Sequence, residues 1–215
     1  MGWWADQVVP RMVDRTLRIG DIVPLRARAC QDLRGEVVEI GFGSGLNCGH
    51  YPEAVRRVAA VEPSDVGWRL ARSNLTRTRA SVARAGLDGQ RLDLPSATYD
   101  CALSTFTMCT IPDLDAALRE VFRVLRPGGA LHFLEHGLAP DPKVARWQHR
   151  LQPVQARLAG GCHLDRPIRE YVERSGLVPE EVDTFYGPGP KPLSYLYLGR
   201  AVKNGLSSPE GGSRV

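Results

Sequence analysis

The sequence lacks any uninterrupted apolar stretch near the roughly 20 residues that a membrane-spanning helix needs. Its first residues also lack the positive charge followed by an apolar segment that marks a secretory signal. Its five cysteines are an odd number without a CxxC pair, which argues against a disulfide framework and against a zinc cluster. The formal net charge is only +4, so no large basic surface is expected. These absences predict a cytoplasmic protein with reduced, mostly buried thiols.

The chain of 215 residues, with 43% hydrophobic and 24% charged residues, is long enough for a globular domain with a substantial core. We predict a single domain over residues 1–203. Within it, residues 1–34 are expected to form an N-terminal helical cover, and residues 139–176 a helical insertion on the substrate side. The tail over residues 204–215 has no core residues and is expected to be disordered.

The stretch VVEIGFGSGLN, residues 37–47, carries the strongest signal. Its β-branched start is typical of a buried parallel strand. Gly41, Gly43 and Gly45 then allow the backbone to turn sharply and to approach a ligand. The next residue is leucine, where a dinucleotide-binding GxGxxG motif needs glycine, and a P-loop lysine is absent. Glu39 places an acid at the strand end, which suits S-adenosylmethionine because that nucleoside carries two positive groups and no phosphate.

Two more acids follow predicted strands farther along the chain. Glu62 ends the second strand, where a carboxylate can accept both ribose hydroxyls of a nucleoside. Asp88 follows the third strand and could bond an exocyclic adenine amine, although a plain surface Asp-Gly turn is the alternative. The fourth strand opens into STFTMCTIPD, in which Thr105, Phe106 and Cys109 are candidates for contact with a cofactor or an acceptor.

Strand and helix patterns alternate along the chain and predict an α/β, doubly wound fold. We expect a seven-stranded, mostly parallel sheet in the order 3-2-1-4-5-7-6, with the last strand antiparallel and helices on both faces. The motif RPGG is expected to turn the chain into the fifth strand. Strands are predicted over residues 37–40, 55–61, 81–85, 100–103, 130–134, 178–185 and 193–202, and helices within 3–19, over 25–33, 46–51 and 65–75, and from 114 to the proline at 127.

Nearly the whole chain resembles the class I S-adenosylmethionine-dependent methyltransferases of the small-molecule type. VVEIGFGSGLN is similar to that family's first motif, VEPS to its second, LDGQRLDLP to its adenine segment, and ALREVFRVLRPGGALHFLEH to its fourth helix and fifth strand. The resemblance implies an enzyme with S-adenosylmethionine as cofactor and S-adenosylhomocysteine as product. It assigns cofactor binding to Glu39, Gly41, Gly43, Gly45, Asn47, Glu62, Asp88, Gly89 and Thr105.

The stretches STFTMCTIPD, EHGLAPDP and GCHLDR resemble the branch that contains membrane-associated alkyl thiol methyltransferases. More loosely, they are similar to ubiquinone/menaquinone methyltransferases and to bacterial phospholipid N-methyltransferases. The membrane-associated relatives have an apolar N-terminal anchor, whereas this chain starts with an amphipathic stretch that contains Trp3 and Trp4. We therefore expect at most peripheral membrane contact.

The resemblance does not identify the acceptor, because the acceptor pocket varies within the family. Apolar and aromatic residues in the predicted cover suggest a small lipophilic thiol, phenol or quinol, or amine. The alternatives are a phospholipid or quinone methylated at a membrane surface, and a non-catalytic S-adenosylmethionine sensor. Nucleic acid is not expected as a partner, because the chain has neither a [DN]PP[YF] tetrad nor a Pro-Cys dipeptide. The sequence makes no prediction of the oligomeric state.

Methyl transfer is expected to be an in-line displacement that depends mainly on positioning. His136, after the fifth strand, is the leading candidate for a general base, because an imidazole can take a proton near neutrality. Glu135 or His163 is the candidate that orients or replaces it, and a purely structural role for His136 is the alternative. The five histidines show no ligand spacing such as HxxxH, so no metal site is predicted.

Overall fold

The structure is a computed structural model that describes residues 8–17, 20–158 and 160–205. Trp3 and Trp4 lie outside the described residues, and so do residues 206–215 of the predicted tail. The predictions for those positions therefore stay predictions.

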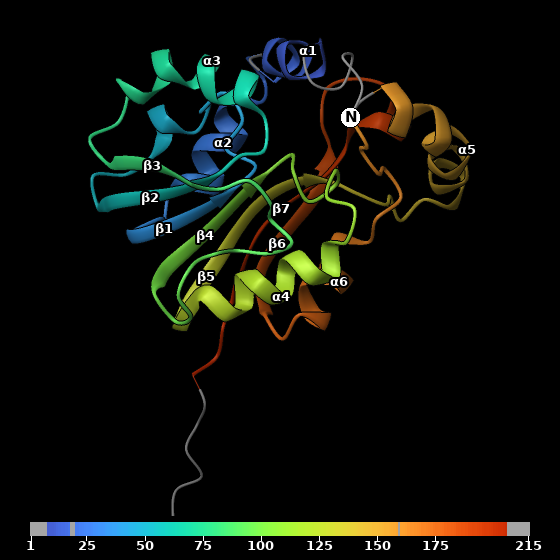
Figure 1. Ribbon diagram of the computed structural model, residues 1–215. Coiled ribbons are helices and arrows are strands. Elements are labelled where there is room, and N and C mark those ends of the chain that lie inside the picture. The colour runs from blue at the N-terminus through green and yellow to red at the C-terminus, as the bar shows by residue number, and fades with distance from the viewer. Residues whose placement is uncertain (1–7, 18–19, 159, 206–215) are drawn as a thin grey trace, which may run out of the picture.

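A seven-stranded sheet forms the centre of the molecule, in the order β3-β2-β1-β4-β5-β7-β6 (Figure 1). The strand β7 is antiparallel to both of its neighbours, and the other neighbouring strands are parallel. The predicted strand order and the antiparallel last strand are thus confirmed. The strands are β1 (Gly35–Ile40), β2 (Val55–Val61), β3 (Ser81–Gly86), β4 (Tyr99–Thr105), β5 (Leu125–His136), β6 (Val178–Tyr186) and β7 (Tyr195–Val202).

Helices cover both faces of the sheet (Figure 1). One face carries α4 (Leu114–Val124) and α6 (Ile168–Arg174), and the other carries α2 (Val23–Cys30) and α3 (Asp65–Leu75). The remaining helices are α1 (Val9–Thr16), α5 (Pro142–Leu158), α7 (Lys191–Ser194) and the 3-10 turn η2 (Cys48–His50). None of the helices in the described ranges combines the length and the apolar character needed to cross a bilayer.

Alternation along each strand explains why the sheet has a core on each side. In β1, Val38 and Ile40 point into the core that α4 and α6 close, while Val37 points into the core beneath α2. Because both faces are covered, nearly all residues of β1 are buried. Of its two glutamates, Glu36 is partly exposed, whereas Glu39 is 0% exposed and faces the α2 side next to the glycine loop.

The RPGG motif does not form a turn between helix and strand, so that prediction was wrong. The helix α4 ends at Val124 and β5 begins at Leu125, which places the motif inside the strand. Gly128 has a φ of 77°, a conformation that glycine adopts without steric cost. Its N–H donates to the carbonyl of Lys203 at 2.7 Å, so the chain after β7 pairs with this irregular start of β5.

The insertion over residues 139–176 begins with a long helix that contains a proline. Pro153 lies inside the 17-residue helix α5. A proline removes one N–H donor, but its fixed φ is compatible with a helix, and the remaining hydrogen bonds maintain the segment.

The first turn of α4 is capped by a side chain, and this cap can be tested. The side chain of Asp113 accepts a hydrogen bond from the N–H of Ala116 at 2.9 Å. We expect Asp113→Ala to lower the free energy of unfolding by about 1 kcal/mol, because the cap is lost. In a domain of this size the melting temperature should fall by about 2–4 °C. Asp113→Asn keeps the cap and should melt close to the wild type; an equal loss in both variants would contradict capping.

Candidate functional site

A cavity of about 760 Å³ lies where β1, β2 and β4 end. Its volume is in the range of small-molecule binding sites, and its position is the crevice where open α/β sheets bind ligands. Glu39 and Gly45 are not part of its lining. The other positions predicted to bind the cofactor do line it: Gly41, Gly43, Asn47, Glu62, Asp88, Gly89 and Thr105.

The glycine loop needs its glycines for two different reasons. Gly41, Gly43 and Gly45 have φ values of 74°, 57° and 71°, in the left-handed region that disfavours side chains. A Cβ on Gly41 would lie 2.0 Å from Thr107 Oγ1, so this position has no room for one. A Cβ on Gly43 would meet no atom closer than 3.9 Å, so the missing side chain at Gly43 leaves open space in the cavity wall.

Glu62 is held rigidly at the end of β2. Its Oε2 accepts a hydrogen bond from Gly43 N at 2.6 Å, and its Oε1 accepts one from Ser64 N at 2.7 Å. Burial raises the pKa of this carboxyl, and the two N–H donors oppose that rise. Each carboxylate oxygen can accept two hydrogen bonds, so each retains a position for one hydroxyl of a diol.

Asp88 fits both interpretations that the sequence allowed. Its Oδ1 accepts a hydrogen bond from Gln90 N at 2.8 Å, which is the geometry of a surface turn. The residue nevertheless lines the cavity, beside the exposed side chain of Leu87. The turn therefore presents an acid and an apolar side chain together at the rim of the cavity.

A buried polar network joins α2 to the glycine loop and to β4. Arg26 of α2 donates from Nη1 to Asn47 Oδ1 at 2.9 Å and to Thr105 Oγ1 at 2.8 Å. Asn47 Nδ2 donates to Glu39 Oε1 at 2.9 Å, and the Tyr51 hydroxyl donates to the other oxygen of Glu39. The network explains how the chain tolerates a fully buried carboxylate, because its oxygens have hydrogen-bond donors and a cation lies nearby.

Arg26 is a lining residue that the sequence did not reveal. The helix α2 contains two arginines, and arginines are normally exposed, so no pattern marks Arg26 as buried. Here it is 4% exposed and lines the cavity. Its Nε has no hydrogen-bond partner within the described part of the chain. A buried guanidinium N–H without a partner is costly, so this atom is a donor available to a ligand.

The three residues predicted to be catalytic are not among the described residues that line the cavity. Glu135 is fully buried, and its Oε1 accepts hydrogen bonds from Ser104 Oγ at 2.7 Å and from Thr107 N at 3.0 Å. Burial raises the pKa of this carboxyl. Glu135 thus holds the loop after β4, and across the described residues no hydrogen bond joins it to His136. His163 lies with its Nδ1 3.0 Å from Gln152 Nε2.

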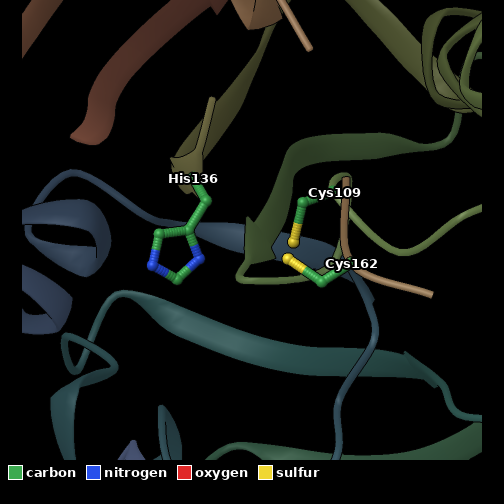
Figure 2. Close-up of side chains that lie close together, drawn as sticks. All are labelled: Cys109, His136 and Cys162. Atoms are coloured by element: carbon green, nitrogen blue, oxygen red, sulfur yellow. The ribbon is translucent and has the colours of Figure 1, made fainter. Parts of the chain in front are cut away.

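His136 lies against two cysteines instead (Figure 2). The possible ligand atoms of Cys109, His136 and Cys162 are all within 4.8 Å of one another. The ring of His136 also packs on Phe106 of the cavity wall, with 5.0 Å between ring centroids. Hydrogen bonds from Cys109 and His136 lower the pKa of the Cys162 thiol. All five cysteines are free and buried, as predicted. The sequence did not predict that two of them lie close to a histidine.

Comparisons with known proteins agree with this geometry. The family model described as "Methyltransferase domain" matches residues 38–133. The chain is 30% identical over 193 residues to the thiol S-methyltransferase TMT1B of Mus musculus, covering 80% of this chain and 75% of that protein. It is 27% identical over 168 residues to the phosphatidylethanolamine N-methyltransferase of Cereibacter sphaeroides, covering 70% and 78%.

Among solved structures, an S-adenosylmethionine-dependent methyltransferase from Thermotoga maritima has the same fold. The TM-score is 0.63 at 21% sequence identity, and the match covers 93% of this chain and 100% of that chain. At this identity the likeness concerns the fold alone.

The buried network predicts a specific dependence of stability on pH. Burial raises the pKa of Glu39 from 4.5 to about 7, against the hydrogen bonds from Tyr51 and Asn47, which lower it. Because folding raises this pKa, the contribution of Glu39 to stability is full below pH 4.5 and is lost as the pH rises through about 7. A shift of this size corresponds to about 3 kcal/mol.

Glu39→Gln removes this titration and can keep the hydrogen bonds to Asn47 and Tyr51. We therefore expect its free energy of unfolding, relative to the wild type, to rise by about 3 kcal/mol between pH 4.5 and pH 8. Urea unfolding of the cofactor-free proteins across this range measures the difference. Glu53→Gln, at an exposed ion pair with Arg79, is the control and should run parallel to the wild type. A constant difference between Glu39→Gln and wild type would contradict the raised pKa.

Proposed function

Because this chain belongs to the class I S-adenosylmethionine-dependent methyltransferases of small molecules, we propose that its acceptor is a small lipophilic molecule, and a thiol in the first place. It is an enzyme that uses S-adenosylmethionine as cofactor. The observation that carries the proposal on the acceptor is the cavity, whose wall combines the cofactor loop with many apolar side chains. Those side chains are Leu17, Ile40, Phe42, Leu46, Val61, Leu87, Phe106 and Ile111.

The residues of the cavity fit the cofactor group by group. The acceptor positions that remain on Glu62 suit the ribose hydroxyls, and Asp88 with Leu87 suits the adenine amine and ring. The open space at Gly43 allows the backbone to approach the ligand. The unpaired Nε of Arg26 suits the carboxylate of the methionine part, since charge-assisted hydrogen bonds are the strong ones. When bound, the cofactor supplies a methyl group that its sulfonium already activates.

The role left to the chain is to hold the acceptor beside that methyl group and to exclude water. Leu17 and Phe106 contribute apolar surface for this purpose. The hydroxyls near Phe106 already donate elsewhere: Thr110 Oγ1 to Thr107 O at 2.8 Å, and Thr107 Oγ1 to Thr105 O at 3.2 Å. These hydroxyls are therefore engaged within the protein. An acceptor that ionises easily suits this part of the cavity, because it depends least on a base.

This argument favours a thiol over the other acceptors. A thiol ionises with a pKa of about 8.5, whereas a phenol needs about pH 10. The similarity to a protein named thiol S-methyltransferase supports the same choice. His136 stays the candidate base for acceptors that need one, because its ring packs on Phe106.

A screen of matched acceptors tests the proposal. Alkyl and aryl thiols would be compared with phenols, quinols and amines of the same carbon skeleton, with release of S-adenosylhomocysteine as readout. We expect kcat/KM for the lipophilic thiols to exceed that for the matched phenols at least tenfold at pH 7.5, because roughly a tenth of a thiol of pKa 8.5 is ionised there. Preference for a quinol or a phospholipid vesicle would favour the membrane-surface alternative and contradict the thiol.

The assignment of Glu62 has a separate test that needs no acceptor. We expect Glu62→Gln to weaken the binding of S-adenosylmethionine about tenfold or more, because hydrogen bonds to an ionised group are worth about 1.5–3 kcal/mol. Calorimetry measures the affinity, and circular dichroism checks the fold, since Glu62 also bonds Gly43 and Ser64. Glu53→Gln serves as the control acid away from the cavity. Unchanged affinity in Glu62→Gln would remove the ribose assignment.

A further inference from the structure

Three segments that are far apart in the sequence bring soft ligand atoms together beside the cavity (Figure 2). Cys109 comes from the loop after β4, His136 is the last residue of β5, and Cys162 lies in the loop after α5. Of the residues that the structure describes, these form the one group of three or more potential ligands of this kind whose ligand atoms lie so close together. We propose that Cys109, His136 and Cys162 bind a soft divalent cation, of which Zn²⁺ is the representative.

The chemistry of the three donors selects the class of ion. Thiolate sulfur and imidazole nitrogen are the ligands that Zn²⁺ prefers, and they suit Mg²⁺ and Ca²⁺ poorly. A tetrahedral zinc ion holds such atoms about 3.6–3.8 Å apart. The ligand atoms lie within 4.8 Å of one another, so small side-chain rotations would close the site. Three protein ligands leave the fourth tetrahedral position to a ligand from outside the chain.

The backbone around the three residues is already fixed without an ion. The N–H of His163 donates to the carbonyl of Cys109 at 2.7 Å, which ties the two cysteine-bearing loops together. Gln152 Nε2 donates to the carbonyl of Cys162 at 3.2 Å, and Arg166 Nη1 donates to the carbonyl of Met108. Only side-chain rotations are then needed for binding, which keeps the cost of ordering the site low.

The place of the two thiols in the fold determines what an ion there would do. Cys109 is 1% and Cys162 is 6% exposed, so two thiols lie in a nearly dry space. Both flank the cavity wall, because Thr110 follows Cys109, and Gly161 precedes Cys162. An ion at this point would fasten the loop after α5 to the ends of β4 and β5. It would also bind a ring nitrogen of His136, which could then not act as a base there. The thiol acceptor proposed above depends least on such a base.

Cobalt titration of the reduced, tag-free full chain tests the site directly. We expect one equivalent of Co²⁺ to bind, with the absorption band of thiolate bonded to cobalt, and Zn²⁺ to displace it. Cys109→Ala and Cys162→Ala should each weaken binding at least tenfold and reduce the band. Cys101→Ala is the matched control, because Cys101 is another buried cysteine, in β4, that lies outside the cluster. It should bind as the wild type does.

A second measurement covers variants that do not fold. X-ray absorption of the Zn²⁺-loaded wild type should show two sulfur atoms and at least one nitrogen around the metal. A shell of nitrogen and oxygen alone would overturn the proposal, and so would a wild type that binds no Co²⁺ in the reduced state. A Cys109–Cys162 disulfide in air-exposed protein, followed by no Co²⁺ binding after reduction, would also overturn it. None of these readouts depends on methyl transfer, so the metal site and the acceptor can fail independently.

Discussion

The cofactor end of this molecule depends on how a buried carboxylate is neutralised. Glu39 lies fully buried near the end of β1, and Asn47 and Tyr51 each donate a hydrogen bond to one of its oxygens. Arg26 reaches the same network from α2 and contacts Thr105 at the end of β4. One set of side chains therefore joins the first strand, the glycine loop, the preceding helix and the central strand. Removing the partner of a buried charged group in such a network would lower the stability of the fold by several kcal/mol. The network therefore favours this one arrangement of the four segments.

Another buried carboxylate fixes the loop after β4. Glu135, the last residue but one of β5, accepts hydrogen bonds from Ser104 and from the backbone of that loop. That loop carries Phe106 and the threonines of the cavity wall, and also Cys109. The proposed acceptor side is thus organised by a carboxylate that faces the protein interior. A glutamate that suggests acid-base chemistry in the sequence can instead hold a loop in place. Burial of the side chain, with hydrogen bonds from the protein to its oxygens, identifies the structural role.

The division of tasks fits an enzyme whose cofactor brings its own activation. Glu62 and Asp88 present acids to the cavity, and apolar residues such as Phe106 line it as well. Positioning and exclusion of water can supply a large part of the barrier reduction in such a reaction. The hydroxyls of Thr107 and Thr110 in the wall near Phe106 donate to carbonyls of the protein, which is in keeping with an acceptor that ionises readily. The proposed cation site lies behind this wall, where it would stabilise the loop after α5.

Local patterns in the sequence determined the strand order, the helices on both faces and the glycine loop, because periodicity and turn residues act over a few neighbours. They also placed Glu62 and Asp88 beside the cavity, since parallel strands end at one edge of the sheet. Only the tertiary structure decided the burial of Arg26, the inward role of Glu135 and the meeting of Cys109, His136 and Cys162. These features join segments far apart in the chain, and no spacing rule relates residues whose contact exists only after the sheet and the insertion have packed.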